Sequence, residues 1–446
     1  MSAGDTHSTR NYELAFAEVE HQLPSGGWLA GLRREALTHF SRTGFPTTRD
    51  EDWKYTSLRD IDKQRFVPAT GAAAIPSAQT MDAAAIDGLD AIRLVFVDGF
   101  FVESLSHAGR LPDGVTVGSL ASALADGGEQ LQPHLAQVAD TAMHRFAALN
   151  TAFVSDGAWL HVAAGVELDK PVYLLFLSSH AEARQLIQPR VLVVAERQAK
   201  LGLIEHYADP HNSGAFTNVV TEISAGEGAQ VEHYLLQEHG DAGYHIGSVH
   251  VAQQADSRYV SHNVNLGGAL VRHDIHARML GQGANAVLNG LFMVGDRQHL
   301  DNHTRVDHAV PHTGSDEYYK GVLYGKGRAV FNGKVVVHRD AQKTDAAQYN
   351  GNLLLSPMAE IDTKPELEIY ADDVKCAHGA TVGQLDEDAL FYLRSRGLDA
   401  AAAREVLTFA FAGDVLAKMG LAPVRSRLEK IVASRLPGAG VAQELI

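Results

Sequence analysis

The architecture is clearest from the stretch Ala284-Asn285-Ala286-Val287-Leu288-Asn289-Gly290-Leu291-Phe292-Met293-Val294, because the chain repeats its pattern further on. The echo reads Arg328-Ala329-Val330-Phe331-Asn332-Gly333-Lys334-Val335-Val336-Val337, and the two Asn-Gly pairs are 43 residues apart. We interpret this distance as two turns of about 22 residues, while Gly228-Ala229-Gln230-Val231 and Asp256-Ser257-Arg258-Tyr259 are spaced by about 28. Short strands at such a period predict a β-solenoid, whose coils bury their inner faces only by stacking. The pattern alone leaves a β-sandwich open as the alternative.

Four regions follow from the changes of pattern along the chain. Residues 1–90 predict an N-terminal helical region with a linker, opening with a polar tail over 1–10. Residues 91–152 predict a mixed α/β connecting segment. Residues 153–383 hold short strands punctuated by Gly, Asp and Asn, which predict the solenoid core. Residues 384–446 return to a helical pattern, so the expected fold is mainly β with helical regions at both ends.

Local signals predict several element boundaries. Asp98-Gly99 between two apolar runs predicts a β-hairpin, because this pair readily adopts the positive φ of a two-residue turn. The stretch 129–149 predicts a helix. Asp386 and Asp399 are predicted N-caps of two C-terminal helices.

Composition and charge argue against several classes of protein. The 446 residues carry a formal net charge of −16, with an isoelectric point near 5.8. Nucleic-acid binding needs a basic surface, and anionic membranes would repel this chain. The longest purely apolar run, Val172–Leu177, is shorter than the about 20 residues that span a bilayer, and the N-terminus lacks the apolar segment of a secretion signal. A single cysteine excludes an internal disulfide and fits a reducing compartment, so we expect a cytoplasmic protein.

The single cysteine stands two positions before a histidine, in Cys376-Ala377-His378-Gly379. In an extended strand, residues i and i+2 point to the same face, a little under about 7 Å apart. A thiolate beside an imidazole suits iron–sulfur species or zinc. One Cys and one His cannot complete a tetrahedral site, so further ligands must come from elsewhere in the chain or from a second chain. The alternative is structural: a small buried thiol and a hydrogen-bonded strand histidine.

This motif is part of a longer resemblance to a known family. The resemblance rests on Tyr319-Lys320-Gly321-Val322-Leu323, Phe331-Asn332-Gly333-Lys334-Val335-Val336-Val337, Arg339-Asp340-Ala341-Gln342-Lys343-Thr344-Asp345, Asn352-Leu353-Leu354-Leu355-Ser356, Pro365 to Gly383 and Asp386 to Gly397. In these stretches the chain resembles the SufB/SufD family of iron–sulfur cluster assembly scaffolds. The match is weaker over 145–280, and near the N-terminus it depends mainly on Glu51-Asp52-Trp53-Lys54-Tyr55-Thr56. The resemblance implies a right-handed parallel β-helix.

The resemblance also implies a role and partners. The chain would be a non-catalytic scaffold that pairs with a SufB-like subunit and docks a SufC-like ATPase on its C-terminal helices. When isolated, it would form a homodimer. SufB-like chains usually carry several cysteines, so the single cysteine favours the SufD branch. His378 would act with a SufB cysteine on the nascent cluster and would be the metal ligand shared with the partner; Cys376 is the less direct candidate. The cluster would be transient, and the isolated chain would hold none stably.

The expected ATPase contacts lie on the predicted C-terminal helices. They are apolar residues spaced along helical faces: Leu390, Leu407, Phe411 and Val415. Gly325-Lys326-Gly327 lacks the spacing of a phosphate-binding loop, so we expect ATP hydrolysis on the partner.

Two groups of histidines are candidates for a metal site: His299, His303, His308 and His312, and His262, His273 and His276. On a strand, His273 and His276 would point to opposite faces. We expect most of these rings to be solvent-facing or hydrogen-bonded to neighbouring coils. A weaker alternative is that the group from His299 to His312 lines a subunit interface.

A carbohydrate-active β-helix enzyme is the alternative function, because paired carboxylates hydrolyse glycosidic bonds. The candidate acids are Asp340, Asp345, Asp362, Asp372 and Asp373. Acidic residues between strands are usually solvated turn residues, and the three tryptophans lie at 28, 53 and 159, away from these acids in the sequence. The scaffold is the favoured interpretation.

Overall fold

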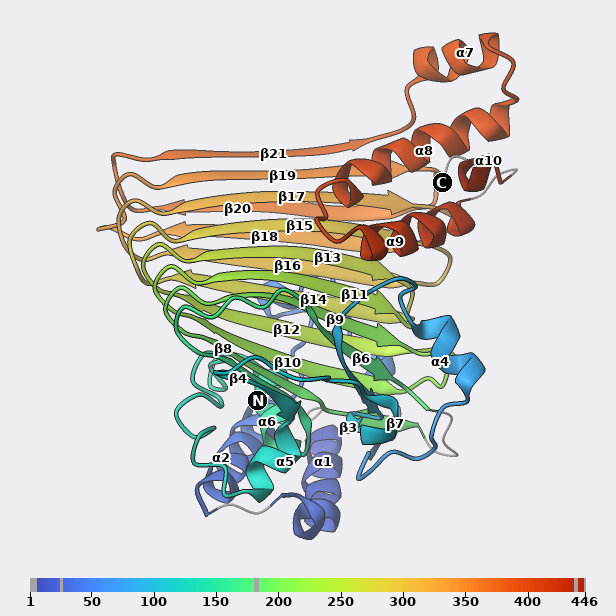
Figure 1. Cartoon of the computed structure of the whole chain (residues 1–446). Helices are drawn as coiled ribbons and strands as arrows, with labels where there is room; N and C mark the ends of the chain where they lie inside the picture. The colour runs from blue at the N-terminus through green and yellow to red at the C-terminus, as the bar shows by residue number, and fades with distance from the viewer. Residues whose placement is uncertain (1–5, 25–26, 180–183, 437–439, 445–446) are drawn as a thin grey trace.

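The computed structural model describes residues 6–24, 27–179, 184–436 and 440–444, and its core is a β-solenoid of about eight turns (Figure 1). Each turn adds one strand to each of two sheets. Sheet A has the order β20-β18-β16-β14-β12-β10-β8-β5-β4, and sheet B the order β21-β19-β17-β15-β13-β11-β9-β6-β2-β3. The predicted class, mainly β with helices at both ends, is confirmed.

Sheet A consists of β4 (Val115–Ser119), β5 (Gly157–Val162), β8 (Arg190–Ala195), β10 (Phe216–Ala225), β12 (Tyr244–Gln253), β14 (Leu270–Met279), β16 (His299–His308), β18 (Arg328–Val337) and β20 (Glu360–Ile369). Sheet B consists of β2 (Ile92–Val97), β3 (Phe100–Phe101), β6 (Val172–Leu177), β9 (Lys200–Ala208), β11 (Gln230–Glu238), β13 (Arg258–Leu266), β15 (Asn285–Val294), β17 (Gly314–Leu323), β19 (Asp345–Leu354) and β21 (Lys375–Gly383). The short strands β1 (Val67–Pro68) and β7 (Gln185–Ile187) pair with each other, and β7 also pairs with β10.

The length of one coil differs from our interpretation of the repeat. Asn285 of β15 pairs with Gly314 of β17, which is 29 residues further along the chain. Gln230 of β11 pairs with Arg258 of β13, which is 28 residues further, so the longer of the two spacings is one coil. The shorter turn that we inferred from the Asn-Gly pairs is wrong. Those pairs lie in opposite sheets, on β15 and β18, and are separated by about one and a half coils.

Both Asn-Gly pairs lie inside strands and not in turns. A Cβ added to Gly290 would meet the ring of Tyr319, on the next coil, at 2.0 Å. A Cβ added to Gly333 would meet the side-chain amide of Gln348 at 2.0 Å. Glycine is therefore required at these positions because large interior side chains occupy the space of its missing Cβ.

The interior is built from ladders of inward-facing residues. Side chains alternate between the two faces of each strand, so in-register residues of successive coils stack in columns. Most columns are aliphatic, but polar groups are also buried among them: Glu205 pairs with His233 at 2.9 Å and accepts a hydrogen bond from Thr221. These three side chains are buried, and their pairing satisfies groups that would be costly to bury alone.

The first coils are closed by antiparallel strands and helices. β3 pairs antiparallel with β2, and β4 pairs antiparallel with β5. The predicted hairpin is confirmed: Asp98 and Gly99 have φ of 52° and 88° between β2 and β3. The helices of this region are α1 (Thr6–Val19), α2 (Gly27–Thr43), α3 (Arg59–Asp62), α4 (Ala78–Ala84), α5 (Leu120–Ala125) and α6 (Arg145–Phe153). Aromatic side chains of α1, α2 and α6 form a buried cluster with Phe216 and Tyr244 of sheet A.

Two expectations for this region need correction. Helix α1 begins at Thr6, inside the segment predicted to be a tail, while residues 1–5 lie outside the described residues. The stretch 129–149 is helical only from Arg145 onward. Residues 129–144 run instead in turns against sheet A, where backbone N–H groups donate to Glu222.

The C-terminal helices begin where their caps predict. They are α7 (Glu387–Ser395), α8 (Ala400–Leu416), α9 (Ala422–Arg435) and α10 (Val441–Glu444). Asp386 accepts a hydrogen bond from the N–H of Ala389, and Asp399 from the N–H of Ala402, both at 2.8 Å. These two predicted N-caps are confirmed.

Helices α8 and α9 pack back onto the outer face of sheet B (Figure 1). Val415 and Leu416 of α8 are fully buried in this contact. Arg427 of α9 pairs with Glu238 of β11 at 2.8 Å. Helix α7 stands away from the solenoid, beyond the end of the last strands (Figure 1). No helix of the described residues is long and apolar enough to cross a membrane, and the cytoplasmic location stays a prediction.

Candidate functional site

The Cys376–His378 pair lies on the last strand of the solenoid. Strand β21 pairs with β19 on one side, and no other described strand pairs with its second edge. Cys376 is in register with Ala346 and His378 with Gln348. Both neighbours are inward-facing, so the two side chains lie on the interior face of the last coil, as the alternation predicts.

The two residues differ in their surroundings. Cys376 is half-buried and packs against an apolar cluster that includes Val335, Val337 and Ala346. Burial raises the pKa of its thiol, and the neighbouring Asp345 raises it further, so the unmodified side chain is a poor thiolate. His378 is exposed. The motif thus combines a protonated thiol inside the last coil with an accessible imidazole.

A buried polar column leads to His378. Register pairing places Glu317, Gln348 and His378 on three successive coils of sheet B. Glu317 accepts hydrogen bonds from Thr304 at 2.5 Å and from Gln348 at 3.1 Å. Burial raises the pKa of Glu317 to about 7, although these hydrogen bonds oppose the rise. A titratable carboxyl is therefore buried two coils from the exposed histidine.

Cys376 and His378 do not form a complete metal site within this chain. Among the described residues, no third His, Cys, Asp or Glu joins them in a group that could hold an ion. An iron–sulfur cluster at this position would need ligands from a second chain.

The same end of the molecule exposes large apolar side chains. They lie on β20, β21, α7 and the loop after β20: Ile369, Tyr370, Val382, Phe391 and Tyr392. Phe391 is the most exposed of these, at 72%. Exposed apolar groups gathered at one end of a monomer are typical of an interaction surface.

The four predicted ATPase contacts differ in accessibility. Leu390 and Val415 are buried, and Val415 packs against sheet B. Leu407 and Phe411 are half-buried. The ring of Phe411 lies 4.3 Å from the ammonium group of Lys320, which also pairs with Asp414 at 2.5 Å. Their role in docking stays a prediction.

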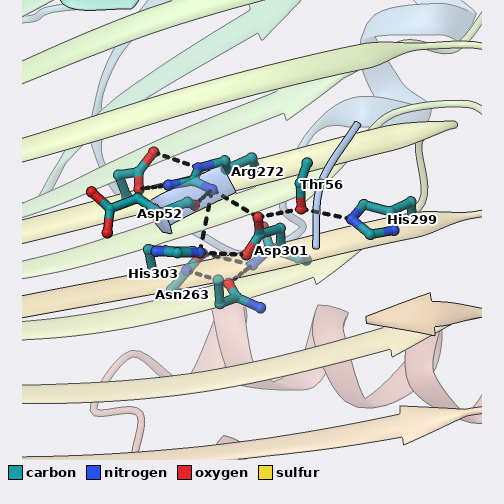
Figure 2. A network of polar contacts seen from close by, with 10 residues as sticks. Asp52, Thr56, Asn263, Arg272, His299, Asp301 and His303 are labelled. Carbon is teal, nitrogen blue, oxygen red and sulfur yellow. Dashed lines mark hydrogen bonds and ion pairs between the residues drawn. The ribbon is translucent and has the colours of Figure 1, made fainter. Parts of the chain in front are cut away.

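A second polar region lies on the outer face of sheet A, where the Glu51–Thr56 loop docks (Figure 2). The guanidinium of Arg272 lies 3.8 Å from the centre of the Trp53 ring and donates to the carbonyl of Asp52 at 2.6 Å. Thr56 donates to Asp301 at 2.5 Å and contacts His299 at 2.8 Å. The Glu51–Thr56 segment therefore binds the N-terminal region to sheet A through the contacts of Trp53 and its neighbours.

Asp301 is the centre of this network. It pairs with Arg272 at 2.8 Å and with His303 at 3.0 Å (Figure 2). Burial would raise the pKa of Asp301, but His303 and Arg272 outweigh burial and hold it well below its ordinary value. A charged carboxylate is thus retained under the loop.

Beside this network lies a cavity of about 480 Å³ between sheet A and the N-terminal region. Its lining includes Trp53 and Arg272, and also four histidines, at positions 144, 250, 276 and 303. We did not predict this cavity from the sequence. The signal that could have found it is the coil register, which places His250 of β12 directly beside His276 of β14.

Of the predicted histidine groups, His299 and His303 meet in the network around Asp301, and the other members are dispersed. His273 faces the interior, stacked on His245 at 4.7 Å between ring centres, while His276 lies on the outer face, as strand alternation predicts. His262 stacks on Tyr234 beneath the C-terminal helices. His308 is buried and bonded to Thr313 and Ser315. His312 lies in a turn with φ of 58°.

The five candidate acids of the enzyme alternative occupy the turns and strands of the last coils. Asp340 and Asp372 are exposed, and Asp373 pairs with Lys343 in an exposed ion pair. Asp345 begins β19, and Asp362 is half-buried on β20, where burial raises its pKa. These positions favour ordinary turn and edge roles.

Comparison with known proteins gives two family matches that together span most of the chain. Residues 176–411 match the family described as "SUF system FeS cluster assembly, SufBD core domain". Residues 7–174 match the family described as "SufBD protein N-terminal region".

Individual relatives agree with these matches. The chain is 37% identical to an iron–sulfur cluster assembly SufBD family protein of Synechocystis, with 91% of each chain covered. It is 33% identical to the iron–sulfur cluster assembly protein SufD of Escherichia coli, over 91% of this chain and 92% of the relative. It is 30% identical to the chloroplastic protein ABCI7 of Arabidopsis thaliana, over 92% and 86%.

Proposed function

Since the chain belongs to the SufBD family of iron–sulfur cluster assembly proteins, we propose that it is the SufD-type scaffold subunit of a complex with a SufB-like subunit and a SufC-like ATPase. The complex supports assembly of a nascent cluster and acquisition of iron. The chain itself is not the catalyst, and ATP hydrolysis belongs to the partner. The similarity to a SufD over nine-tenths of both chains supports this branch of the family.

The observation that carries the proposal is the open last coil. Strands β20 and β21 each have one edge without a described partner strand, and Cys376 and His378 lie beside that edge. An unpaired strand edge offers backbone donors and acceptors to a second chain. A SufB-like partner seated here would supply the ligands that complete a site around His378.

The two edge strands are not equally suited to pairing. Strand β20 contains Pro365, which has no N–H to donate. Every second residue of the strand is charged, in Glu360-Ile361-Asp362-Thr363-Lys364-Pro365-Glu366-Leu367-Glu368-Ile369. Proline and charge are devices that keep an edge strand from pairing. Strand β21 has no proline, and Lys375 is its one lysine, arginine or acidic residue. We therefore assign the backbone pairing with the partner to β21.

The ATPase contact belongs to the C-terminal helices. Helix α7 exposes Phe391 and Tyr392 away from the solenoid, and Phe411 of α8 is half-buried nearby in sequence. Aromatic residues are frequent anchors of protein interfaces. Phe391→Asp should release the ATPase while the partner scaffold stays bound; Glu387→Ala, an exposed change on the same helix, is the matched control.

The decisive experiment is co-expression with the SufB-like and SufC-like chains of the same organism. Purified complexes are analysed for subunit ratio, iron and acid-labile sulfide. We expect His378→Ala to lower the cluster content severalfold with unchanged subunit ratios, and Cys376→Ser to have a milder effect. Lys375→Ala, an exposed change on the same strand, is the control.

Two results would contradict the site assignment. Wild-type cluster content in the His378 variant would remove this histidine from the cluster site. Loss of the complex itself would assign His378 a structural role in pairing. Mass measurement of the isolated chain separately decides between a monomer and a homodimer formed through β21.

A further inference from the structure

Three histidines from distant parts of the sequence meet in the cavity on the outer face of sheet A. His144 is the N-cap residue of α6, His250 lies on β12 and His276 on β14. One ring nitrogen of each histidine lies within 4.8 Å of a ring nitrogen of the other two. The ring centres of His144 and His250 are 4.7 Å apart, and each is 6.2 Å from that of His276. The cluster is built from a sheet and the segment that covers it.

The buried ring of His250 is the strongest evidence that this cluster binds a ligand. Its side chain is 2% exposed, and neither of its ring nitrogens has a hydrogen-bond partner among the described residues. A buried polar group without a partner costs about 1–3 kcal/mol, so such groups are normally satisfied by protein, water or an ion. The ring lines the cavity together with His144 and His276, which identifies the direction from which a ligand would come.

A carboxylate holds the ring of His276 in the way that is usual for metal-binding histidines. Its Nε2 makes a short hydrogen bond to Asp307, leaving Nδ1 as its ligand atom. Asp307 is fixed in turn by Arg305, which donates to both carboxylate oxygens at 2.9 Å. A carboxylate on the second ring nitrogen fixes the tautomer and orientation of the imidazole and makes it a better ligand.

The ladder on this face explains why these residues are adjacent. Register pairing aligns Glu222, His250, His276, Arg305 and Lys334 on five successive strands of sheet A. The carboxylate of Glu222 accepts hydrogen bonds from backbone N–H groups in the turns before α6. Those same turns lead directly to His144, so the contact with Glu222 positions the third histidine over the other two.

We propose that His144, His250 and His276 bind one divalent ion of the first-row transition metals, of the zinc and ferrous iron class, with an open coordination position facing the cavity. Three imidazoles and an exchangeable fourth ligand are a typical donor set for these ions. Bonds of about 2.0–2.1 Å place tetrahedral ligand nitrogens roughly 3.3 Å apart, so the rings need to close by at most about 1.5 Å. Rotation of the side chains around the cavity can supply this movement.

The test uses the isolated, tag-free chain, stripped with a chelator and titrated with Co²⁺ under anaerobic conditions. Wild type should bind one equivalent and develop the visible absorption of a nitrogen-ligated cobalt ion, which Zn²⁺ then displaces. His250→Gln and His276→Gln should weaken binding at least a hundredfold. Asp307→Asn, which weakens the support of His276 without removing a proposed ligand, should weaken it about tenfold.

The matched control is His161→Gln, a half-buried histidine of β5 that faces Glu196 outside the cavity and should leave binding unchanged. Each variant is also melted with and without Zn²⁺, because an ion that binds only the folded state raises Tm in proportion to its occupancy. A folded His250→Gln variant with no zinc-dependent shift supports the site.

Two outcomes would overturn the proposal. The first is a wild-type chain that retains no stoichiometric Co²⁺ or Zn²⁺ at micromolar concentration. The second is undiminished binding by both histidine variants. Because every measurement is made on the isolated chain, the result is independent of partner pairing at β21 and of cluster assembly.

Discussion

At its first coils the solenoid is covered, whereas its last coil is bare. The first coils carry antiparallel partners, helices α1, α2 and α6, and the fully buried ion pair of Arg190 and Glu222. In the last coil most side chains of β20 are half-buried and most of β21 are exposed, and each strand has one edge without a described partner strand. Both ends share one interior, so the difference lies in what covers them. Buried networks at the first coils should stabilise the folded chain. The surface exposed at the last coil can instead be buried when a partner binds.

The largest expected effect is at the covered end. Glu222→Ala leaves the guanidinium of Arg190 buried without a counter-charge and removes the acceptor of three backbone N–H groups, on Ala136, Val138 and Ala139. We expect a loss of about 3–5 kcal/mol in the free energy of unfolding. Urea unfolding measures this loss. A loss below about 1 kcal/mol would show that the turns before α6 are not held by this carboxylate.

The matched control is Glu167→Ala, which breaks an exposed ion pair with Lys200 near the same end. Exposed pairs contribute about 0–1 kcal/mol, so this variant should unfold close to wild type.

The second effect concerns the shared interior near the bare end and depends on pH. Because the folded-state pKa of Glu317 is about 7, above its ordinary value of 4.5, the folded chain holds a proton there that the unfolded chain releases. Its contribution to stability is present below about pH 4.5 and is lost as the pH rises to about 7. The total loss is on the order of 3 kcal/mol.

Glu317→Gln isolates this effect from other titrating groups. The difference in unfolding free energy between the variant and wild type should grow in favour of the variant from pH 5 to pH 7.5 and then level off. A difference that is independent of pH would mean that Glu317 is ionised in the folded interior.

A smaller effect is expected where the N-terminal loop meets sheet A. Trp53→Leu removes the ring that lies over Arg272 and packs on Phe146, and we expect a loss of about 1–3 kcal/mol. Tyr55→Leu, at a more exposed aromatic two residues further, should cost less than about 0.5 kcal/mol. Thermal unfolding of both variants compares them. Equal losses would contradict the role of the Trp53 ring as the fastening contact.

The smallest effect on stability is expected at the bare end itself. Val382 of β21 is 49% exposed, so Val382→Lys should change the unfolding free energy by less than about 0.5 kcal/mol. The same change should weaken pairing with the SufB-like subunit at least tenfold, since it places a charge in the apolar part of the edge. Analytical ultracentrifugation of mixtures measures the second quantity. Unchanged pairing would move the interface away from β21.

Sequence reasoning succeeded where the signal is local. The Asp98-Gly99 hairpin and the caps Asp386 and Asp399 each depend on a few neighbouring residues, and the structure confirms them. The shared face of Cys376 and His378 follows from the alternation of one strand. The family resemblance is likewise confirmed by matches over nearly the whole chain.

It failed where the answer depends on register between distant coils. The Asn-Gly echo misled us because both sheets use the same device, a glycine that makes room for a large interior side chain. Of the helix expected over 129–149, the part before Arg145 is absent, because Glu222, far along the chain, binds its backbone. The meeting of His144 with His250 needs both the coil length and that long-range contact, which no single stretch of sequence contains.

The antiparallel strands β3 and β4 also set how large an assembly can grow. A solenoid with two bare ends could add subunits at both and extend without limit, as fibres do. Here the short reversed strands and the helices beside them stand at the first coils, so the proposed pairing through β21 uses the other end alone. A scaffold that pairs through one strand edge alone forms a pair and nothing longer along the solenoid axis. The proposed pairing would therefore stop at two scaffolds because the chain turns back on itself near Gly99, and ATPase docking on the C-terminal helices would be a separate contact.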